Sequence, residues 1–315
     1  MSKVPVAASS PEIIAIARVP AGACRGGLTP GSLGPHSGWT MDHDLEMRRY
    51  LFDLAGYMVI PDVLERAEID ELNRLIDAQG LPPPHEKIRF GAAAGGAPEC
   101  PGFLDWGKPF CDLLDHPRIM PLLQLTLGDW FRLDRLYGIN METGMGAHQL
   151  HGGNAPYSPA EYYHVRNGRI HNAFTVVSWN LVDTGPGHGG FCCVPGSHKS
   201  NFVRPDPIPT VNQGRWEMLE GDSLAPGVVI PEAPAGSVVL FSEALTHGTA
   251  PWTGPHQRRT LLYKYCQSHL AWSARRVRPP ASVPLTPRQQ ILFQEPANPG
   301  TWTTSLFPET ESNPA

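Results

Sequence analysis

After about residue 130 the sequence breaks into short apolar runs, each bounded by Gly or Pro. The runs read "FRLDRLYGINME" (131–142), "NAFTVVSWNLVD" (172–183), "GGFCCVPGSH", "GSVVLFSEALTHG" and "RRTLLYKYCQ". Their β-branched and aromatic residues predict strands, and short strands separated by turns are typical of a β-barrel or sandwich. The 34 Pro and 32 Gly residues fall between the patterned segments and indicate turns and long loops.

Helical periodicity belongs mainly to the part of the chain before these runs. The clearest helix is predicted for 64–80, where Gly80 provides the stop and one apolar stripe contains Leu64, Ile69, Leu72, Leu75 and Ile76. A short helix, a turn at Gly56 and the strand Tyr57–Ile60 precede it, and 110–128 predicts one or two further helices. Helices followed by a β-rich core indicate a mainly β domain with flanking helices.

Three regions are expected along the chain. Residues 1–43 are rich in Ala, Gly, Pro and Ser and predict an irregular or flexible leader. Residues 44–268 contain all the strong patterns and form the expected domain. Residues 269–315 form a Pro-rich C-terminal extension, with one short helix around 287–294.

Composition excludes several classes of function. The net charge is −5 and no concentrated basic stripe is present, which argues against nucleic-acid binding. Neither a signal peptide nor an apolar run of membrane-spanning length is found. The six cysteines form no CxxC spacing, and the adjacent Cys192 and Cys193 do not suit a disulfide framework. We expect a soluble cytoplasmic protein with buried thiols and no membrane partner; its oligomeric state stays open.

Two histidines are the strongest candidates for metal ligands. His151 follows a predicted strand in "GAHQLHGGNAP" (146–156), and His247 ends the predicted strand "SVVLFSEALTH". Neutral imidazoles at strand ends are suited to a metal site at the mouth of a barrel. A carboxylate two residues after the first histidine would lie on the same side of the strand, but that position is Gly153.

A possible clamp for a carboxylate follows the second histidine. Arg258 begins the strand "RRTLLYKYC", and a guanidinium there suits bidentate binding of a carboxylate. Thr249, two residues after His247, offers a hydroxyl to the same group. The alternative is a buried core histidine with Arg258 on a solvated edge.

Other polar residues near these positions have structural interpretations. His148 would point away from His151 on a strand, although a helical segment would place both on one face. Glu243, four residues before His247, would reach a metal only if the strand were broken there, so a structural role is expected. His198 in "PGSHK" is expected to brace a turn.

These segments resemble the phytanoyl-CoA dioxygenase family of Fe(II)- and 2-oxoglutarate-dependent oxygenases. The resemblance covers 45–267 and includes "YLFDLAGYMVIPDVLERAEIDEL", "LVDTGPGHGGFCCVPGSHKSN" and "LFSEALTHGTAPWTGPHQRRTLLYKY". It implies a double-stranded β-helix, that is, a cupin-like jelly roll with flanking helices. It also implies that His151 and His247 bind iron, and that Arg258, helped by Thr249, holds the distal carboxylate of 2-oxoglutarate.

The resemblance implies further residues around the co-substrate. Arg259 would replace Arg258 if the strand register were shifted by one residue. Trp179 matches an aromatic position that lines the co-substrate pocket in the family, and Tyr137 and Asn140 are weaker candidates for the pocket lining.

Three functions follow from the resemblance. The first is hydroxylation of a small molecule with O₂, Fe(II) and 2-oxoglutarate as co-substrate. The second is halogenation on the same scaffold, with chloride in the space that Gly153 leaves; water, the substrate, Asn154 or a carboxylate from another segment would also fill it. The third is a catalytically silent jelly-roll binding protein. The substrate is not specified, because specificity lies in loops such as 82–100 and 154–170.

Overall fold

The structure of the chain is a computed structural model that describes residues 41–85, 88–94, 100–145, 148–204 and 227–307. These residues belong to the compact unit Trp39–Ala315. The other unit, Met1–Gly38, and nearly all of the expected leader 1–43 lie outside the described residues. Helix α1 (Met41–Ala55) already begins within the last residues of that expected leader.

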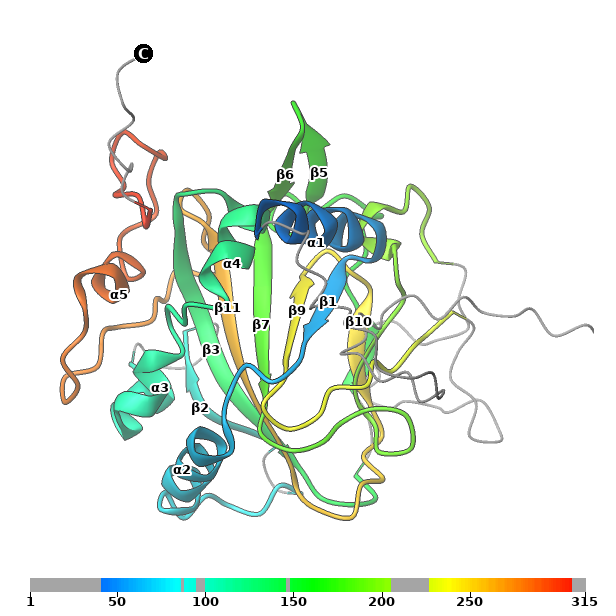
Figure 1. Ribbon diagram of the computed structural model, residues 1–315, viewed down its shortest axis with the longest axis vertical. Helices are drawn as coiled ribbons and strands as arrows, with labels where there is room; N and C mark the ends of the chain where they lie inside the picture. The colour runs from blue at the N-terminus through cyan, green and yellow to red at the C-terminus, as the bar shows by residue number, and fades with distance from the viewer. Residues whose placement is uncertain (1–40, 86–87, 95–99, 146–147, 205–226, 308–315) are drawn as a thin grey trace, which may run out of the picture. The chain divides into compact units, whose positions relative to one another are not determined.

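Two antiparallel sheets face each other and form the expected jelly roll (Figure 1). The larger sheet has six strands in the order β1 (Tyr57–Ile60), β9 (Val238–Ser242), β7 (Phe174–Asn180), β11 (Arg258–Gln267), β3 (Phe131–Met141) and β2 (Arg89–Ala93). The smaller sheet has three strands in the order β4 (His148–His151), β10 (His247–Ala250) and β8 (Gly190–Cys193). A separate hairpin pairs β5 (Tyr163–Arg166) with β6 (Arg169–Asn172). The mainly β fold with flanking helices is therefore confirmed.

Strand β11 separates two hydrophobic cores because successive side chains point to opposite faces of a sheet. Leu262 belongs to the core between the two sheets, together with Ile139 of β3 and Phe191 of β8. Its neighbours Leu261 and Tyr263 belong to the larger core on the outer face of the six-stranded sheet. Arg258 and Lys264 share the parity of Leu262, so they face the interior of the jelly roll.

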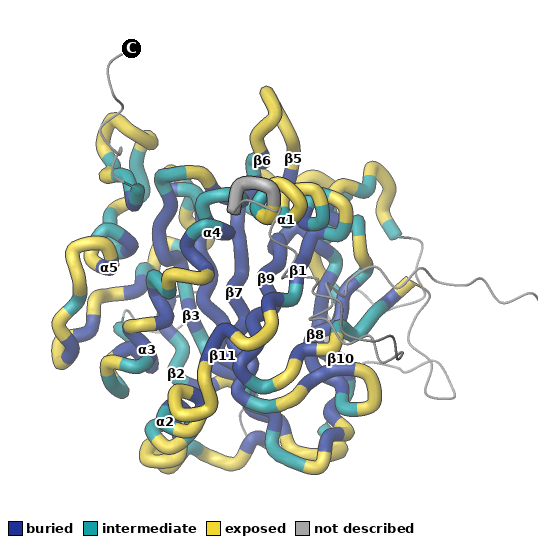
Figure 2. The backbone as a smooth tube through the Cα atoms, viewed as in Figure 1, coloured by how far each residue is buried: buried dark blue, intermediate teal, exposed yellow. Residues whose placement is uncertain are grey.

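Helices cover part of the outer face of the larger sheet (Figure 1). They are α2 (Arg66–Asp77), the 3-10 helix η1 (Gly102–Trp106), α3 (Lys108–Asp112) and α4 (Met120–Leu127). The strands of the sheets are buried along most of their length, whereas the exposed positions lie on loops and outer helix faces (Figure 2). In the described part of the chain, no helix has the length and apolar character needed to span a membrane.

Helix α2 forms as its apolar stripe predicts. A capping box between Glu65 and Glu68 starts it, and the stripe buries Ile69, Leu72 and Ile76 in the larger core. The helix ends at Asp77, and the chain then turns with Gly80 in the left-handed region at φ +57°.

The segment "GSVVLFSEALTHG" is two strands and not the single strand that the sequence predicts. Strand β9 ends at Ser242 in the larger sheet, and β10 begins at His247 in the smaller sheet. Between them the N–H of Leu245 donates to the Ser242 carbonyl (3.0 Å), and the N–H of Ala244 donates to Ser242 Oγ (3.1 Å). This serine-stabilised turn interrupts the ladder. His247 therefore begins a strand instead of ending one.

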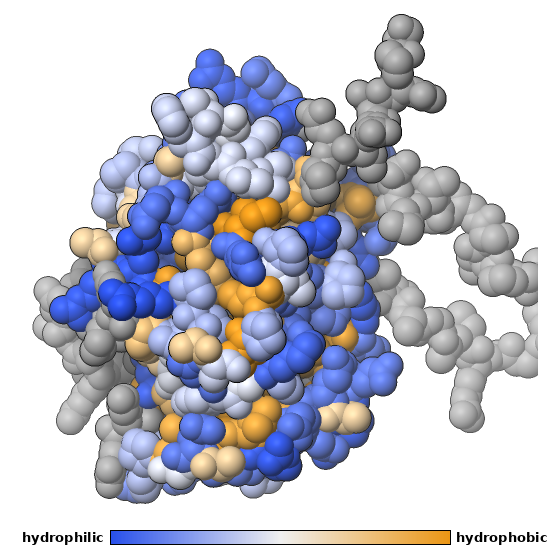
Figure 3. Space-filling model, turned by 90° about the vertical axis from the view of Figure 1, so that its left-hand side faces the viewer, coloured by the Kyte–Doolittle hydropathy of each residue, from blue (hydrophilic) through white to orange (hydrophobic). Residues whose placement is uncertain are grey.

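The C-terminal segment contributes to the larger core. The predicted short helix is present as α5 (Pro287–Ile291), with Thr286 and Gln289 forming a capping box. Leu292 and Leu306 are buried in the same core as the helices, and the N–H of Leu306 donates to the Asp129 carbonyl at 3.0 Å. On the side of α3 and α5, exposed apolar side chains lie among hydrophilic ones (Figure 3).

The segment "PGSHK" attaches the smaller sheet to α1. Within it the 3-10 helix η2 (Ser197–Lys199) buries His198, whose Nε2 lies 3.0 Å from the Asp53 carbonyl of α1. Its ring packs edge-on against Tyr163, with the centroids 4.4 Å apart. Gly56 has φ +80°, and a Cβ there would lie 2.4 Å from His198 Nδ1, so the turn after α1 requires glycine. Burial, with a smaller contribution from Lys199, lowers the pKa of His198 to about 4.

The apolar stripe of α2 leads to a prediction about stability. Replacing Leu72, 1% exposed, with Ala should lower the free energy of unfolding by about 2–5 kcal/mol, because a cavity remains in the larger core. The matched control is Asp70→Ala on the solvent side of the same helix, where an exposed ion pair with Arg66 contributes less than about 1 kcal/mol. Urea unfolding of both variants measures the difference. Equal effects would show that α2 does not dock as described.

The burial of His198 predicts a dependence of stability on pH. The pKa of His198 is lower in the folded protein, about 4, than the ordinary value of 6.5, so the unfolded chain binds more protons between these values. Stability from this group is present above pH 6.5 and is lost as the pH falls toward 4. Between pH 7 and 5 the loss is about 2 kcal/mol.

Urea unfolding at both pH values, compared with His198→Gln, isolates this contribution. The variant is expected to lose about 2 kcal/mol less than the wild type over the same interval. An equal pH dependence in both proteins would contradict a neutral, buried His198.

Candidate metal and co-substrate site

The structure brings the two predicted ligand histidines together. His151 is the last residue of β4 and His247 is the first residue of β10, and the two lie directly opposite each other in the antiparallel ladder. Their ring centroids are 4.2 Å apart. Thr249 lies opposite His148, so the segment is a strand and the helical alternative for His148 is wrong. The pair is a product of strand register, which local sequence periodicity does not specify.

Backbone contacts orient the ring of His247. Its Nδ1 lies 2.7 Å from the Leu245 carbonyl and donates its proton there, which leaves the Nε2 lone pair available to a metal. Burial, followed by the neighbouring His151, lowers the pKa of His247 to about 3. The imidazole is therefore neutral at physiological pH, and this is the form that binds metals.

Glu243 lies in the turn between β9 and β10, next to this pair. Ligand atoms of His151, Glu243 and His247 all lie within 4.8 Å of one another, and Glu243 is buried. The sequence predicts a structural role for Glu243 on the assumption of an unbroken strand. The strand is broken after Ser242, and the turn carries the carboxylate to the histidines. The apolar pattern around Glu243 gave no sign of this break.

Two cations hold the carboxylate of Glu243 from the larger sheet. Lys264 Nζ donates to both carboxylate oxygens, at 2.7 and 2.9 Å, and Arg135 Nη2 lies 3.4 Å from Oε1. Burial raises the pKa of Glu243, but Lys264, His247 and Arg135 outweigh this effect and hold it below its ordinary value. The carboxylate is therefore ionised.

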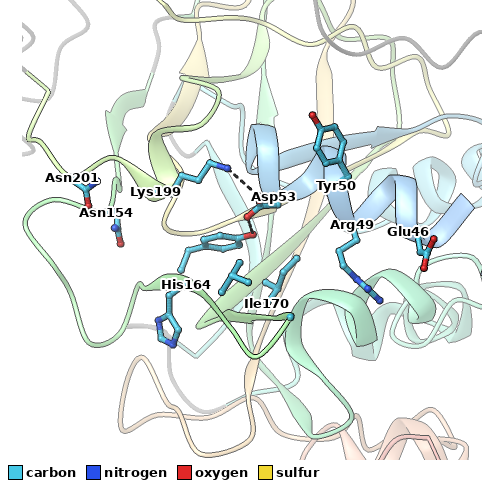
Figure 4. Close-up of a pocket in the computed structure, with 12 residues that line it drawn as sticks. Glu46, Arg49, Tyr50, Asp53, Asn154, His164, Ile170, Lys199 and Asn201 are labelled. Carbon is cyan, nitrogen blue, oxygen red and sulfur yellow. Dashed lines mark hydrogen bonds and ion pairs between the residues drawn. The ribbon is translucent and has the colours of Figure 1, made fainter. Parts of the chain in front are cut away.

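Position 153 does not carry a ligand, and its neighbour Asn154 points elsewhere. Gly153 has φ +101°, and a Cβ there would lie 3.0 Å from Thr246 Oγ1. Asn154 lines a surface cavity of about 680 Å³ beside α1, together with Asp53, Lys199 and Asn201 (Figure 4).

Arg258 and Thr249 form the expected polar pair inside the jelly roll. Both are buried, and Arg258 Nη1 lies 3.4 Å from Thr249 Oγ1 and 3.4 Å from Met141 Sδ. Arg258 Nε has no hydrogen-bond partner among the described residues. Burial lowers the pKa of Arg258 to about 10, which leaves the guanidinium charged at physiological pH. A buried cation with an unused donor fits an anionic ligand such as a carboxylate.

Arg259, the alternative clamp, faces the opposite side of β11. Its Nη2 lies 2.6 Å from Asp77 Oδ1 and its Nε 2.8 Å from Gln257 Oε1, near the C-terminal end of α2. The alternation of side chains along the strand therefore places Arg258, and not Arg259, inside the jelly roll.

The expectation that Trp179 lines the co-substrate pocket is not met. Its ring packs against His116 and Tyr263, with centroids 5.4 and 6.5 Å away, in the larger core. The interior position of β7 is the next residue, Asn180, whose Oδ1 accepts a hydrogen bond from Thr260 (3.3 Å). Asn180 Nδ2 is buried and has no hydrogen-bond partner within the described part of the chain. This residue, which the sequence pattern did not single out, is therefore the better pocket-lining candidate.

The two weaker candidates for the pocket lining, Tyr137 and Asn140, lie on opposite faces of β3. Tyr137 faces the interior, with Lys264 Nζ 5.6 Å and the Arg89 guanidinium 4.7 Å from the centre of its ring. Asn140 lies on the opposite face and lines a cavity of about 270 Å³ together with Arg259. Only Tyr137 lies on the side of the histidines.

The donor set fits a non-heme iron centre. Two neutral imidazoles and a carboxylate are the ligands that Fe(II) oxygenases use, and they leave coordination positions open. Thr249 of the clamp follows His247 by two residues on β10, and Arg258 reaches it from β11 of the larger sheet.

Comparison with known proteins identifies the family. Residues 52–260 match the family model described as Phytanoyl-CoA dioxygenase (PhyH). The chain is 24% identical over 258 residues to an ectoine dioxygenase of Sphingopyxis alaskensis, covering 73% of this chain and 78% of that protein.

Solved structures share the fold. HygX from Streptomyces hygroscopicus with nickel and 2-oxoglutarate bound aligns with a TM-score of 0.57 at 21% identity, over 74% of this chain and 89% of that one. The α-ketoglutarate-dependent epimerase SnoN aligns with a TM-score of 0.51 at 19% identity, over 79% and 97%. With the family match over most of the jelly roll, the chain belongs to the phytanoyl-CoA dioxygenase family and is a non-heme iron- and 2-oxoglutarate-dependent oxygenase.

Proposed function

We propose that this enzyme hydroxylates a small molecule and that His151 and His247 bind its Fe(II). Arg258, with Thr249, holds the distal carboxylate of 2-oxoglutarate. The observation that carries the proposal is the buried Arg258, whose Nε has no hydrogen-bond partner among the described residues. Arg258 lies on the interior face of the larger sheet, and this face is the one turned toward the histidine pair. The names of the relatives support the small-molecule class: an ectoine dioxygenase, and HygX with hygromycin B bound.

The residues of the chain bind, orient and exclude water. Arg258 and Thr249 fix one end of the co-substrate, and the histidines fix the metal. Phe241 and Phe191 pack close to His247, with ring centroids 4.8 and 6.2 Å away, and keep water from this side of the site. Bound iron supplies the oxidative chemistry, in which 2-oxoglutarate and O₂ yield succinate and CO₂ and one oxygen atom enters a substrate C–H bond.

Halogenation is the second candidate, and Gly153 is the observation that favours it. It would require chloride at the metal in place of a carboxylate ligand. A dependence of product formation on chloride separates it from hydroxylation. A silent binding protein, the third candidate, would bind neither Fe(II) nor 2-oxoglutarate well.

Arg258 gives the sharpest test of the co-substrate site. Arg258→Met should weaken binding of 2-oxoglutarate to the Fe(II)-loaded protein by about 10- to 150-fold, the range for losing a charged hydrogen bond. The measurement is an anaerobic titration that follows the visible charge-transfer band of 2-oxoglutarate chelated to Fe(II). Arg258→Lys should retain part of the affinity, because it keeps the charge and loses the bidentate geometry.

Two controls accompany this variant. Arg259→Met removes the adjacent guanidinium, which lies on the outer face, and Trp179→Phe alters the larger core. Both should leave the affinity for 2-oxoglutarate unchanged, although Trp179→Phe should lower thermal stability. Absence of the band in folded wild-type protein would overturn the proposed function. An equal loss for Arg259→Met would show that the clamp has been placed on the wrong residue.

A further inference from the structure

We propose that Glu243 is the third metal ligand and supplies the carboxylate that position 153 lacks. This inference rests on the proposed iron site and adds one residue to it. The carboxylate ligand then comes from the turn before His247, and not from position 153 after His151. The three donor groups, from His151, Glu243 and His247, already lie within 4.8 Å of one another.

A close backbone contact explains how the carboxylate reaches the histidines. A Cβ on Gly152 would lie 2.5 Å from the Leu245 carbonyl oxygen and 2.8 Å from that of Glu243. The N–H of Gly153 donates to the Ala244 carbonyl at 2.9 Å. The chain after β4 therefore packs directly against the turn 243–245, and only glycine at 152 permits this approach.

The same contact makes position 153 a poor place for a carboxylate. Gly152 and Gly153 both have positive φ, +80° and +101°, a region that residues with a side chain rarely adopt. A Cβ on Gly153 would also press on Thr246 Oγ1 at 3.0 Å. One backbone arrangement therefore disfavours a carboxylate at position 153 and places the carboxylate of Glu243 next to the histidines.

The turn also fixes the second histidine. Leu245 is fully buried in the core between the sheets, and its carbonyl accepts the Nδ1 proton of His247. A turn anchored by a core side chain and by Ser242 thus positions Glu243 and the Nε2 atom of His247 together.

Lys264 and Arg135 act as positioning residues for Glu243. They are directly opposite each other on β11 and β3, on the interior face. Both oxygens of Glu243 accept from Lys264, so one oxygen can bind the metal while the other keeps its hydrogen bond. Metal-binding carboxylates are commonly held by such a partner, whose loss weakens metal binding by about 10–100-fold.

This assignment bears on the reaction. With Glu243 bound, two imidazoles and one carboxylate complete the protein ligand set, and chloride has no vacant protein position to take. Glu243 therefore favours hydroxylation over halogenation despite Gly153.

The test measures metal binding by the full-length chain with Co(II), an air-stable probe for Fe(II), in the presence of 2-oxoglutarate. Calorimetry gives the affinity, and visible absorption reports the ligand set. Glu243→Ala and the nearly isosteric Glu243→Gln should weaken Co(II) binding by at least about 10–100-fold, and Lys264→Met by about 10-fold. Glu161→Gln is the matched control, because Glu161 is a neighbouring acid that is not in the metal group, and it should bind Co(II) like the wild type.

Anion binding provides a second readout that does not depend on activity. Chloride and azide should alter the Co(II) spectrum of Glu243→Ala at lower concentrations than that of the wild type, because the variant offers one exchangeable position more than the wild type. Formate should restore part of the affinity of Glu243→Ala. If that variant does not fold, the affinity and the anion titration of Glu243→Gln, each compared with the wild type, still decide the question.

The outcomes separate this inference from the proposed function. If the wild type binds neither Fe(II) nor Co(II) with 2-oxoglutarate, the proposed function fails. If the wild type binds both and Glu243→Gln binds Co(II) equally tightly, the iron site stands and the role of Glu243 is overturned. Equal sensitivity of the wild-type and Glu243→Ala Co(II) spectra to chloride would overturn it as well.

Discussion

The antiparallel pairing of β4 with β10 is the interaction on which the site depends. It sets His151 against His247 and leaves Thr249 two residues further along, next to the buried Arg258. Both ends of the proposed co-substrate site therefore depend on the register of one short ladder. Because a slip of one residue would turn every side chain to the other face, the hydrophobic residues that hold this register also determine the geometry of the site.

The ionic cluster behind the histidines is hard to explain as a source of stability. Taking Glu243 and Lys264 out of water carries a desolvation penalty, and well-packed apolar residues of similar volume often serve a core at least as well. The larger sheet has apolar side chains at neighbouring interior positions such as Leu262 and Val176. A buried charge network next to the two histidines supports the proposed metal site.

Much of the fold could be predicted from the sequence because its elements carry strong local patterns. The stripe of α2, the turn at Gly56 and the β-rich second half all agree with the structure. The break after Ser242 could not be predicted, because apolar residues continue through the turn. It is visible only in the structure, where β9 and β10 belong to different sheets. The face of Trp179 was missed for a related reason: a strand pattern shows that side chains alternate, but not which parity points inward when both faces are buried.

The burial of Leu306 has a consequence for how the protein is made. Strand β3 pairs through Leu133 with the Leu292 carbonyl, and Phe131 packs against Phe307 with ring centroids 6.2 Å apart. The larger core thus includes side chains from nearly the last described residue. On the ribosome, the jelly roll cannot close this core until residue 307 has left the exit tunnel. Chains that terminate early would expose an apolar surface, a typical substrate for chaperones and proteases.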